Sequence, residues 1–269
     1  ILMTKKINLV VVRNLVDLGI ITFVFAKVFR IKIMYIKAFP LIETKIRDLK
    51  DRRLNKLKVF FLNQVLKIEI FLMKKSTYLI SRTEKFSQFL TENYGIKREI
   101  VSIPMGCDIS SLNKISEERF NFLHGKYKLV DCLTLIYFGS LNKLRNIDFI
   151  ITVVEQVALK NKSIKCFIIG GPMSEQLRLE KIIDEKGLRQ YFFLLGEMDR
   201  SILFEYIQIC DISISPIPPI EEYILSSPTK VIESLALGCP VIVNEEIIDQ
   251  KEIVQSSNSG FSVPYNVDK

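Results

Sequence analysis

Tryptophan and histidine are the residues that this sequence has least of. It contains no tryptophan, one histidine and five cysteines, and no two of the cysteines form a CxxC pair. A zinc site built from histidine and cysteine needs several such ligands close together, so that class of metal site is excluded. Scattered cysteines of odd number are typical of reduced thiols, which indicates a cytosolic protein without a disulfide framework.

A long hydrophobic run is also missing. The longest candidate, residues 18–29, is interrupted by Lys27 and is shorter than the roughly 20 residues that a membrane-spanning helix needs. It lacks the small-residue cleavage pattern of a signal peptide. Neither a GxGxxG motif nor a Walker A motif is present, which argues against NAD and ATP as ligands. We therefore expect a cytoplasmic globular protein whose contact with a membrane, if it has one, is peripheral.

The sequence is long enough for two domains, and its charge divides between two halves. Residues 1–130 carry a net charge of +14 and residues 131–269 a net charge of −6. Opposite signs favour two domains with different partners. We predict domains at residues 1–112 and 131–269, joined by a linker at residues 113–130. Neither end of the sequence has a convincing start or stop, so we expect a fragment in which both domains are incomplete.

Short β-branched runs alternate with helical patterns throughout the second half. The runs are mostly apolar along their whole length, which is typical of parallel strands covered on both faces. Strand–helix–strand alternation predicts a doubly wound, Rossmann-like domain. The predicted strands are Leu133–Phe138, Ile164–Ile169, Phe192–Leu195, Ile212–Ser215 and Pro240–Val243, and the predicted helices are Ile147–Leu159, Glu175–Lys186, Ser201–Cys210 and Pro228–Leu237.

The first half is less regular, but it is also α/β and its pattern begins in mid-domain. One helical pattern carries an apolar stripe, formed by Leu57, Phe60, Phe61, Val65, Ile68 and Phe71. The predicted strands are Ile7–Val12, Ile31–Ile36, Thr77–Ile80 and Glu99–Ile103, and the predicted helices are Leu15–Val28, Leu54–Lys75 and Thr83–Tyr94.

Residues 226–243, which read SSPTKVIESLALGCPVIV, carry the strongest signal. Ser227 is a good N-cap and Pro228 suits the first position of a helix. The free backbone N–H groups at such a helix start form an anion site, which predicts a diphosphate there with Lys230 as a nearby cation. Glu233 lies about one turn beyond Thr229, where a carboxylate can accept both hydroxyls of a ribose. The plain alternative is a solvated glutamate in mid-helix.

Residues 137–148, which read YFGSLNKLRNID, end a predicted strand in Gly139-Ser140 and lead through a polar loop into a helix. Gly139 lets a phosphate or a sugar approach the backbone. Arg145 is a candidate to hold a diphosphate and to neutralise charge on a leaving group, and the same loop offers Lys143. The alternative is an ordinary surface arginine.

Two further predicted strands end in glycine. One reads IIGG and ends in Gly170-Gly171, and the other reads LLGEM and includes Gly196 and Met198. Each signal is weak by itself. Because parallel strands end at the same edge of a sheet, their recurrence predicts a ligand crevice along that edge.

Taken in order, these pieces resemble the donor domain of glycosyltransferase family 4, the glycosyl transferases group 1. The resemblance covers residues 131–264 well, through the YxGSL-type strand end, IIGG, LLGE, CDISISPIPP and, best of all, SPTKVIESLALGCPVIVN. It implies an α/β GT-B fold, in which two Rossmann-like domains face a cleft, here with an incomplete N-terminal domain. It also implies a donor in the C-terminal domain, an acceptor in the N-terminal domain, and no metal or other cofactor.

The resemblance also implies roles for individual residues. Glu233 matches the second glutamate of the family's E-x7-E motif, which holds the ribose of the donor, and Arg145 resembles the family's phosphate-binding basic residue. The implied donor-binding residues are Gly139, Ser140, Gly170, Gly171, Gly196, Met198, Ser227, Pro228, Thr229, Lys230 and Glu233, and the catalytic candidates are Arg145 and Lys143.

The sequence departs from the family pattern in several places. Leu225 stands where the first glutamate of the motif is expected, and Ser140 stands where an arginine is usual. Residues 37–40, which read KAFP, offer no counterpart of the family's N-domain histidine. The family's N-terminal Gly-rich loop and its last helices are also missing, which is why we expect a fragment.

The function that this resemblance implies is a retaining transfer of a sugar from a UDP- or GDP-sugar to a glycan or lipid-linked acceptor, in surface polysaccharide biosynthesis. Three alternatives stay open at this point: a non-catalytic GT-B scaffold or binding subunit, a nucleotide-sugar epimerase, and a nucleic-acid binder. The basic-aromatic interleaving of RNA-binding modules is absent, so we expect no nucleic-acid partner.

The basic first half suggests an anionic membrane surface as a further partner. Basic residues cluster beside the apolar stripe of the predicted helix Leu54–Lys75, a combination that favours binding to anionic lipids. The alternative is a solvated basic face. We expect a cytoplasmic protein that lies peripherally on the inner face of the cell membrane. The clustered residues are Lys50, Arg52, Arg53, Lys56 and Lys58.

Overall fold

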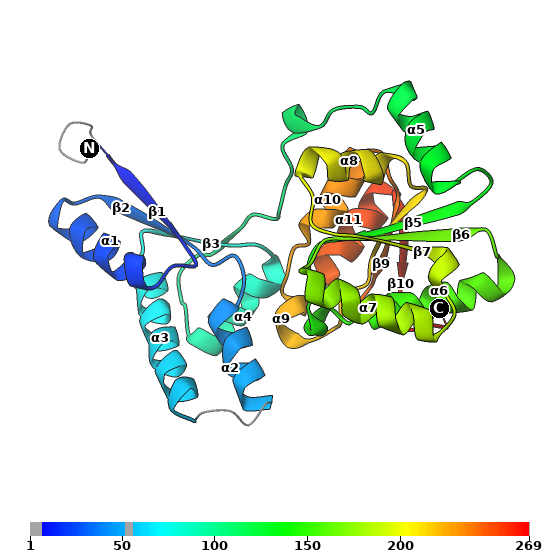
Figure 1. Ribbon diagram of the computed structural model, residues 1–269. Coiled ribbons are helices and arrows are strands. Elements are labelled where there is room, and N and C mark those ends of the chain that lie inside the picture. The colour runs from blue at the N-terminus through cyan, green and yellow to red at the C-terminus, as the bar shows by residue number, and fades with distance from the viewer. Residues whose placement is uncertain (1–6, 52–55, 269) are drawn as a thin grey trace. The chain divides into compact units, whose positions relative to one another are not determined.

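The computed structural model describes residues 7–51 and 56–268 and divides the chain into two compact units. The first unit is Ile1–Pro104 together with Leu225–Ser227, and the second is Met105–Ile224 together with Pro228–Lys269. Each unit is built on its own parallel β-sheet with helices between the strands (Figure 1). The short segment Leu225–Ser227 belongs by its contacts to the first unit, although it lies between two stretches of the second.

The first unit holds four parallel strands whose spatial order follows their order along the chain. Right-handed crossovers that all run in one direction bring the connecting helices to the same face of the sheet. Its core packs residues of α1, α3 and α4 against β1, β2 and β3. The strands are β1 (Leu9–Arg13), β2 (Lys32–Ile36), β3 (Tyr78–Ser81) and β4 (Val101–Ser102), and the helices are α1 (Asp17–Val28), α2 (Leu41–Asp51), α3 (Lys56–Lys75) and α4 (Glu84–Tyr94).

The second unit holds a six-stranded parallel sheet in the order β10-β9-β8-β5-β6-β7. The chain runs outward from β5 to β7, returns to β8 on the other side of β5, and continues to β10. Its helices therefore cover both faces, and α7 and α8 lie on opposite sides of β5 and β6 (Figure 1). The strands are β5 (Leu133–Phe138), β6 (Ile164–Ile169), β7 (Phe192–Leu195), β8 (Ile212–Ser215), β9 (Val241–Asn244) and β10 (Gly260–Val263).

This strand order makes the second unit doubly wound. The order reverses between β5 and β8, and the carboxyl ends of the strands at such a switch point form the usual ligand crevice. The helices are α5 (Glu117–Tyr127), α6 (Asp148–Lys160), α7 (Met173–Glu185), α8 (Arg200–Gln208), α9 (Glu221–Ile224), α10 (Thr229–Ala236) and α11 (Ile248–Ser257).

Most of the predicted elements of the second half are confirmed, four of the strands at the predicted bounds. The segment 113–130, expected as a linker, differs. It contains α5, which begins at the N-cap Ser116 and buries Leu123 in the core of the second unit. The polar sequence of this segment reflects a helix with only one buried side. Five elements were not predicted at all: α2, α5, α9, α11 and β10.

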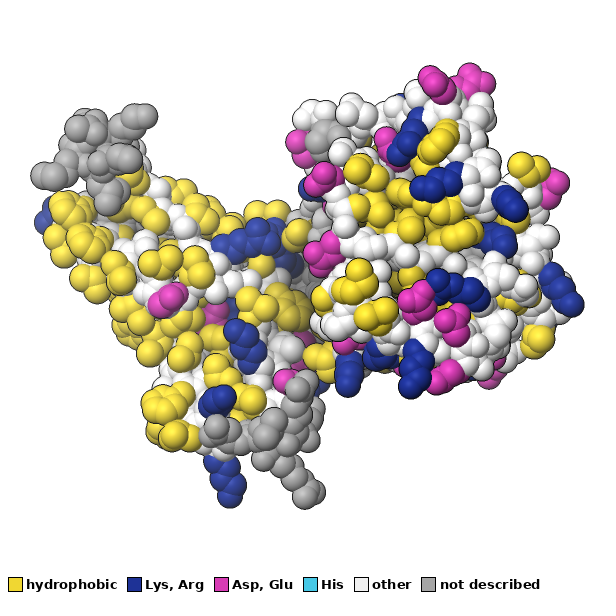
Figure 2. All heavy atoms as spheres, in the orientation of Figure 1, with side chains coloured by type: hydrophobic (Ala, Val, Ile, Leu, Met, Phe, Trp, Pro, Cys, Tyr) yellow, Lys and Arg dark blue, Asp and Glu magenta, His cyan; other side chains and the backbone are white. Residues whose placement is uncertain are grey.

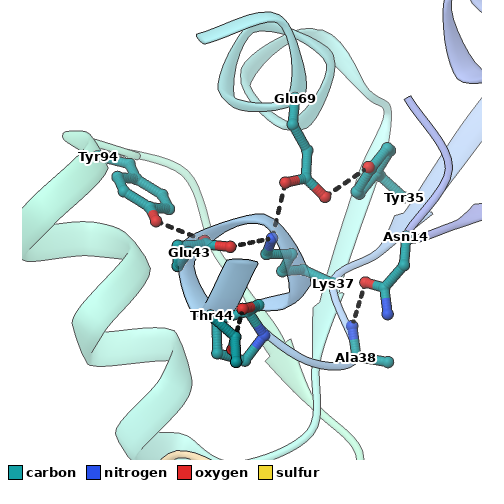
Figure 3. A network of polar contacts seen from close by, with 9 residues as sticks. Asn14, Tyr35, Lys37, Ala38, Glu43, Thr44, Glu69 and Tyr94 are labelled. Atoms are coloured by element: carbon teal, nitrogen blue, oxygen red, sulfur yellow. Dashed lines mark hydrogen bonds and ion pairs between the residues drawn. The ribbon is translucent and has the colours of Figure 1, made fainter. Parts of the chain in front are cut away.

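A buried polar network holds α2 and α3 to the end of β2 in the first unit (Figure 3). Lys37 follows β2 directly and is 0% exposed. Its Nζ donates to Glu43 Oε2 at 3.1 Å and to Glu69 Oε2 at 2.7 Å. Tyr35 donates to Glu69 at 2.9 Å, and Tyr94 donates to Glu43 at 2.5 Å. Burial, and then Glu69, raise the pKa of the Tyr35 hydroxyl, so Tyr35 stays a donor.

The network explains why α3 does not bury the side that the sequence suggests. Its buried residues are Glu69, Leu72 and Met73. Except for the half-buried Val65, the apolar stripe of α3 is exposed. A glutamate is buried instead of phenylalanines because Lys37 and Tyr35 satisfy both oxygens of its carboxylate.

We expect Lys37→Ala to lower the free energy of unfolding by about 3–5 kcal/mol, because it leaves the buried carboxylate of Glu69 and the half-buried one of Glu43 without their cation. The measurement is urea unfolding of the whole chain, followed by far-UV circular dichroism. Lys45→Ala is the control, since Lys45 is exposed on the neighbouring helix α2 and should change stability by less than about 0.5 kcal/mol. Equal effects of the two substitutions would contradict a structural role for the network.

Candidate functional site

The carboxyl ends of β5 and β6 meet at glycines. Gly139 donates its backbone N–H to Ile169, and Gly170 donates to Leu195, so the ladder continues one residue beyond the end of each strand. Both glycines have positive φ, 122° for Gly139 and 115° for Gly170. A Cβ on Gly170 would lie 2.4 Å from the carbonyl oxygen of Gly139. Only glycine allows the two strand ends to approach in this way.

These strand ends form the floor of a cavity of about 600 Å³. Six of the residues expected to bind a donor line it, and they come from four separate stretches of the second half. They are Gly139, Ser140, Gly170, Gly171, Met198 and Glu233. The cavity also includes residues that were not among the predicted site residues, which are Phe138, Ile169, Pro172, Glu197, Arg200 and Leu203.

The start of α10 differs by one residue from the predicted start. Pro228 is the N-cap, with extended backbone at φ −78° and ψ 116°, and the helix begins at Thr229. Ser227 is therefore not the cap, and its contacts belong to the first unit. Proline has no side-chain acceptor and makes no cap hydrogen bond, so the backbone N–H groups of the first turn have no side-chain acceptor from the cap position. That arrangement suits an external anion.

Two cations lie close together beside this helix start. Lys230 Nζ is 3.7 Å from the ring centroid of Tyr137, and the guanidinium of Arg145 is 4.2 Å from the ring centroid of Tyr223. Burial, and then the neighbouring Arg145, lower the pKa of Lys230 well below its ordinary value. Neither cation forms an ion pair with any residue of the described ranges 7–51 and 56–268. Glu233 acts in the opposite direction on the pKa of Lys230, but two like charges without an ion-pair partner in these ranges still favour the binding of an anion.

Glu233 is held by a residue that the sequence did not point to. Nη2 of Arg200 donates to Glu233 Oε1 at 2.5 Å. Burial raises the pKa of Glu233, whereas Arg200 and Lys230 act in the opposite direction. Arg200 is the first residue of α8 and is 33 positions from Glu233 in sequence, so no local pattern could have revealed the pair.

The remaining predicted site residues are not among those that line the cavity. Lys143 is exposed in a 3-10 turn. Gly196 lies one residue before the lining residue Glu197. Thr229 and Lys230 open α10, and Lys230 Nζ lies 3.9 Å from the position that a Cβ on Gly139 would take. The structure therefore brings Lys230 to the strand end, next to Arg145, while Lys143 makes no such contact.

We expect Gly170→Ala to disrupt this site, because the added Cβ would overlap the Gly139 carbonyl oxygen and the backbone would be strained at positive φ. The expected loss is about 1–3 kcal/mol of stability, measured by thermal or urea unfolding. Gly125→Ala is the matched control: it lies within α5 with no atom within 4 Å of the new Cβ, and should be neutral or stabilising by about 0.5–1 kcal/mol. If Gly170→Ala were as stable as the unsubstituted chain, the close approach of the ends of β5 and β6 would not be required for stability.

The second half of the chain resembles a known protein family. A family model described as glycosyl transferases group 1 matches residues 132–269, just over half of the chain. No curated protein matches the sequence.

Several solved structures share the fold. Sucrose-phosphate synthase from Thermosynechococcus elongatus matches with a TM-score of 0.74 at 14% identity, over 97% of this chain and 62% of that one. Anabaena HepE in complex with UDP-glucose matches with a TM-score of 0.69 at 16% identity, over 96% and 65%. Pneumococcal O-GlcNAc transferase GtfA in complex with UDP and GlcNAc matches with a TM-score of 0.65 at 16% identity, over 97% and 46%.

The chain spans less than two thirds of the length of these structures. Identities this low show the fold, which is that of the GT-B glycosyltransferases. The family model adds the family: this chain belongs to the glycosyl transferases group 1.

Proposed function

We propose that the protein is a retaining glycosyltransferase, which moves a sugar from a UDP- or GDP-sugar to a glycan or lipid-linked acceptor in surface polysaccharide biosynthesis. The observation that carries the proposal is the pair Lys230 and Arg145, two cations without an ion-pair partner in the described ranges, beside an uncapped helix start. The same unit matches the family model. Structures with this fold include HepE with UDP-glucose and GtfA with UDP and GlcNAc.

In this proposal the diphosphate of the donor lies at the start of α10. The first-turn N–H groups, Lys230 and Arg145 would then share its negative charge, which grows on the leaving group as the sugar bond breaks. A bound diphosphate would also favour the charged form of Lys230, whose pKa burial and Arg145 lower in the free protein. Side chains and backbone supply the positive charge here, so the proposal includes no metal.

The ribose of the donor would lie on Glu233. This carboxylate lines the cavity one turn further along α10 than Thr229, and one of its oxygens is engaged by Arg200. The other oxygen accepts no hydrogen bond from the described part of the chain. A carboxylate oxygen of this kind is a strong acceptor for a ribose hydroxyl.

A non-catalytic subunit that keeps the fold is the second candidate. The observation that favours it is Leu225, which stands where the family motif has its first glutamate. Leu225 is 5% exposed and belongs to the core of the first unit, so that position offers no carboxylate. Binding without turnover on the full-length protein would support this candidate over an enzyme.

We expect Arg145→Ala to weaken the binding of UDP by about tenfold or more, and the binding of uridine much less, because the lost contact is to the diphosphate. The measurement is isothermal titration calorimetry, with GDP and guanosine as a second pair. Lys143→Ala, in the same loop, should lower the affinity for UDP less than Arg145→Ala does, because only Arg145 lies next to Lys230. Equal losses for nucleotide and nucleoside would contradict the phosphate role of Arg145.

We further propose that the first unit binds an anionic membrane surface from the cytoplasmic side. Exposed hydrophobic side chains gather on α1 and α3 (Figure 2). Exposed basic residues accompany them, including Lys27, Arg30 and Lys32. Apolar side chains next to basic ones suit the interface of an anionic bilayer. The patch comprises Leu18, Ile21, Val24, Phe25, Val28 and Phe29 of α1 and the segment after it, and Leu57, Phe60, Phe61, Ile68 and Phe71 of α3.

The proposed contact with the membrane is peripheral. No helix within residues 7–51 and 56–268 is long and apolar enough to cross a bilayer. Of the basic residues singled out from the sequence, Lys56 and Lys58 are exposed at the start of α3 and Lys50 at the end of α2. Arg52 and Arg53 lie outside the described residues.

We expect the chain to sediment with vesicles of phosphatidylcholine and phosphatidylglycerol but not with phosphatidylcholine alone, and less so at high salt. Phe25→Glu should reduce this binding by on the order of tenfold, since it places a charge in the apolar patch. Leu159→Glu is the control, because Leu159 is similarly apolar and exposed in the second unit. The proposal would be contradicted if the chain bound equally to vesicles with and without phosphatidylglycerol and if neither substitution changed this binding.

A further inference from the structure

The guanidinium of Arg200 is fixed at the cavity by two contacts. It lies 5.2 Å from the ring centroid of Phe204, a buried core residue one turn further along α8. It also donates to Glu233 Oε1 at 2.5 Å. Arg200 and Glu233 both line the cavity. The arginine is thus held between the core of the second unit and the carboxylate that we assign to the ribose.

Arg200 and Glu233 differ in burial, and this difference indicates which of the two depends on the other for its charge. The side chain of Glu233 is 12% exposed, whereas that of Arg200 is 54% exposed. Removing a carboxylate from water favours its protonated form, and a nearby cation opposes this effect. Glu233 therefore depends on its partner for its charge more than Arg200 does.

A second arginine of the same unit shows what a plain surface pair looks like. Arg189 Nη2 lies 2.5 Å from Glu180 Oε1, and Arg189 is 58% exposed. Its partner Glu180 is 34% exposed, and neither residue lines the cavity. Geometry and arginine exposure match those of the Arg200 pair, so the burial of Glu233 and its place in the cavity are what distinguish the two.

We propose that Arg200 is a positioning residue for Glu233: by occupying Oε1 it fixes the carboxylate and leaves Oε2 directed to a ribose hydroxyl of the nucleotide. This inference rests on the proposed donor-binding function. A carboxylate that is already fixed loses less conformational freedom when it binds a ligand, which improves affinity without a new contact to that ligand.

The first test is a double-substitution cycle with UDP as the probe. Arg200→Ala should weaken UDP binding by on the order of tenfold, and Arg200→Lys should restore part of the loss. In a Glu233→Gln background, Arg200→Ala should cause no further loss of affinity for UDP. With 2′-deoxy-UDP as the probe, Arg200→Ala should lower the affinity less than it does with UDP. Arg189→Ala is the matched control and should leave affinity unchanged. An undiminished loss in the Glu233→Gln background, or no loss at all, would overturn the inference.

The second test needs no nucleotide. The carboxyl carbon of Glu233 can be followed by 13C NMR during a pH titration, with the signal assigned by its absence in Glu233→Gln. Arg200 and Lys230 are the cations that act on Glu233, so Arg200→Ala should raise the pKa of Glu233, and Arg189→Ala should not. An unchanged titration would overturn the inference.

The two tests also separate the inference from the function on which it rests. If the unsubstituted chain binds neither UDP nor GDP, the proposed function fails and the ribose part of the inference fails with it. If it binds UDP and Arg200→Ala changes neither affinity nor titration, only the role of Arg200 is wrong.

Discussion

The close approach of β5 and β6 at their carboxyl ends is the constraint on which the site of the second unit depends. Six consecutive residue pairs hold these strands in register, and a glycine directly follows each strand. With no side chain on either glycine, the backbone of both strands becomes the floor of the cavity. The uncapped start of α10 and its lysine are then brought to the same edge, because a parallel sheet places all its strand-to-helix turns there.

Lys37 and Lys230 show how the surroundings of a lysine decide whether its charge stabilises the fold or is available to a ligand. Lys37 is fully buried between two carboxylates, which in turn accept hydrogen bonds from tyrosines. Its charge is satisfied internally, so the network stabilises the first unit and offers nothing to a ligand. Lys230 lies over an aromatic ring next to another cation and forms no ion pair within the described ranges. A bound anion would compensate the charge of these two cations.

The sequence predicted well where one local pattern decides the structure, and poorly where distant residues decide it. Strands β5, β6, β7, β8 and β9 are short runs whose side chains are buried or half-buried, and their composition alone reveals them. Strand β10, at the edge of the sheet, was not predicted. The apolar stripe of α3 was misleading because Lys37, far away in sequence, supplies the partner that lets Glu69 be buried. Arg200 was not predicted as a site residue for the same reason, since only the fold brings the start of α8 to Glu233. The glycines that follow the strands are visible in the sequence, but the absence of an ion-pair partner for Lys230 and Arg145 within the described ranges is not.

The departure from the family motif at Leu225 has a structural cause in this chain. Leu225 packs in the core of the first unit, and its carbonyl accepts a hydrogen bond from Thr83 at 3.0 Å. A glutamate at this position would bury a carboxylate at 5% exposure among apolar side chains, which costs several kcal/mol when no cation is present. Under the proposed function, the donor contacts that such a glutamate would make must therefore come from the backbone at the start of α10. That requirement fits a helix whose N-cap, Pro228, supplies no competing side-chain acceptor.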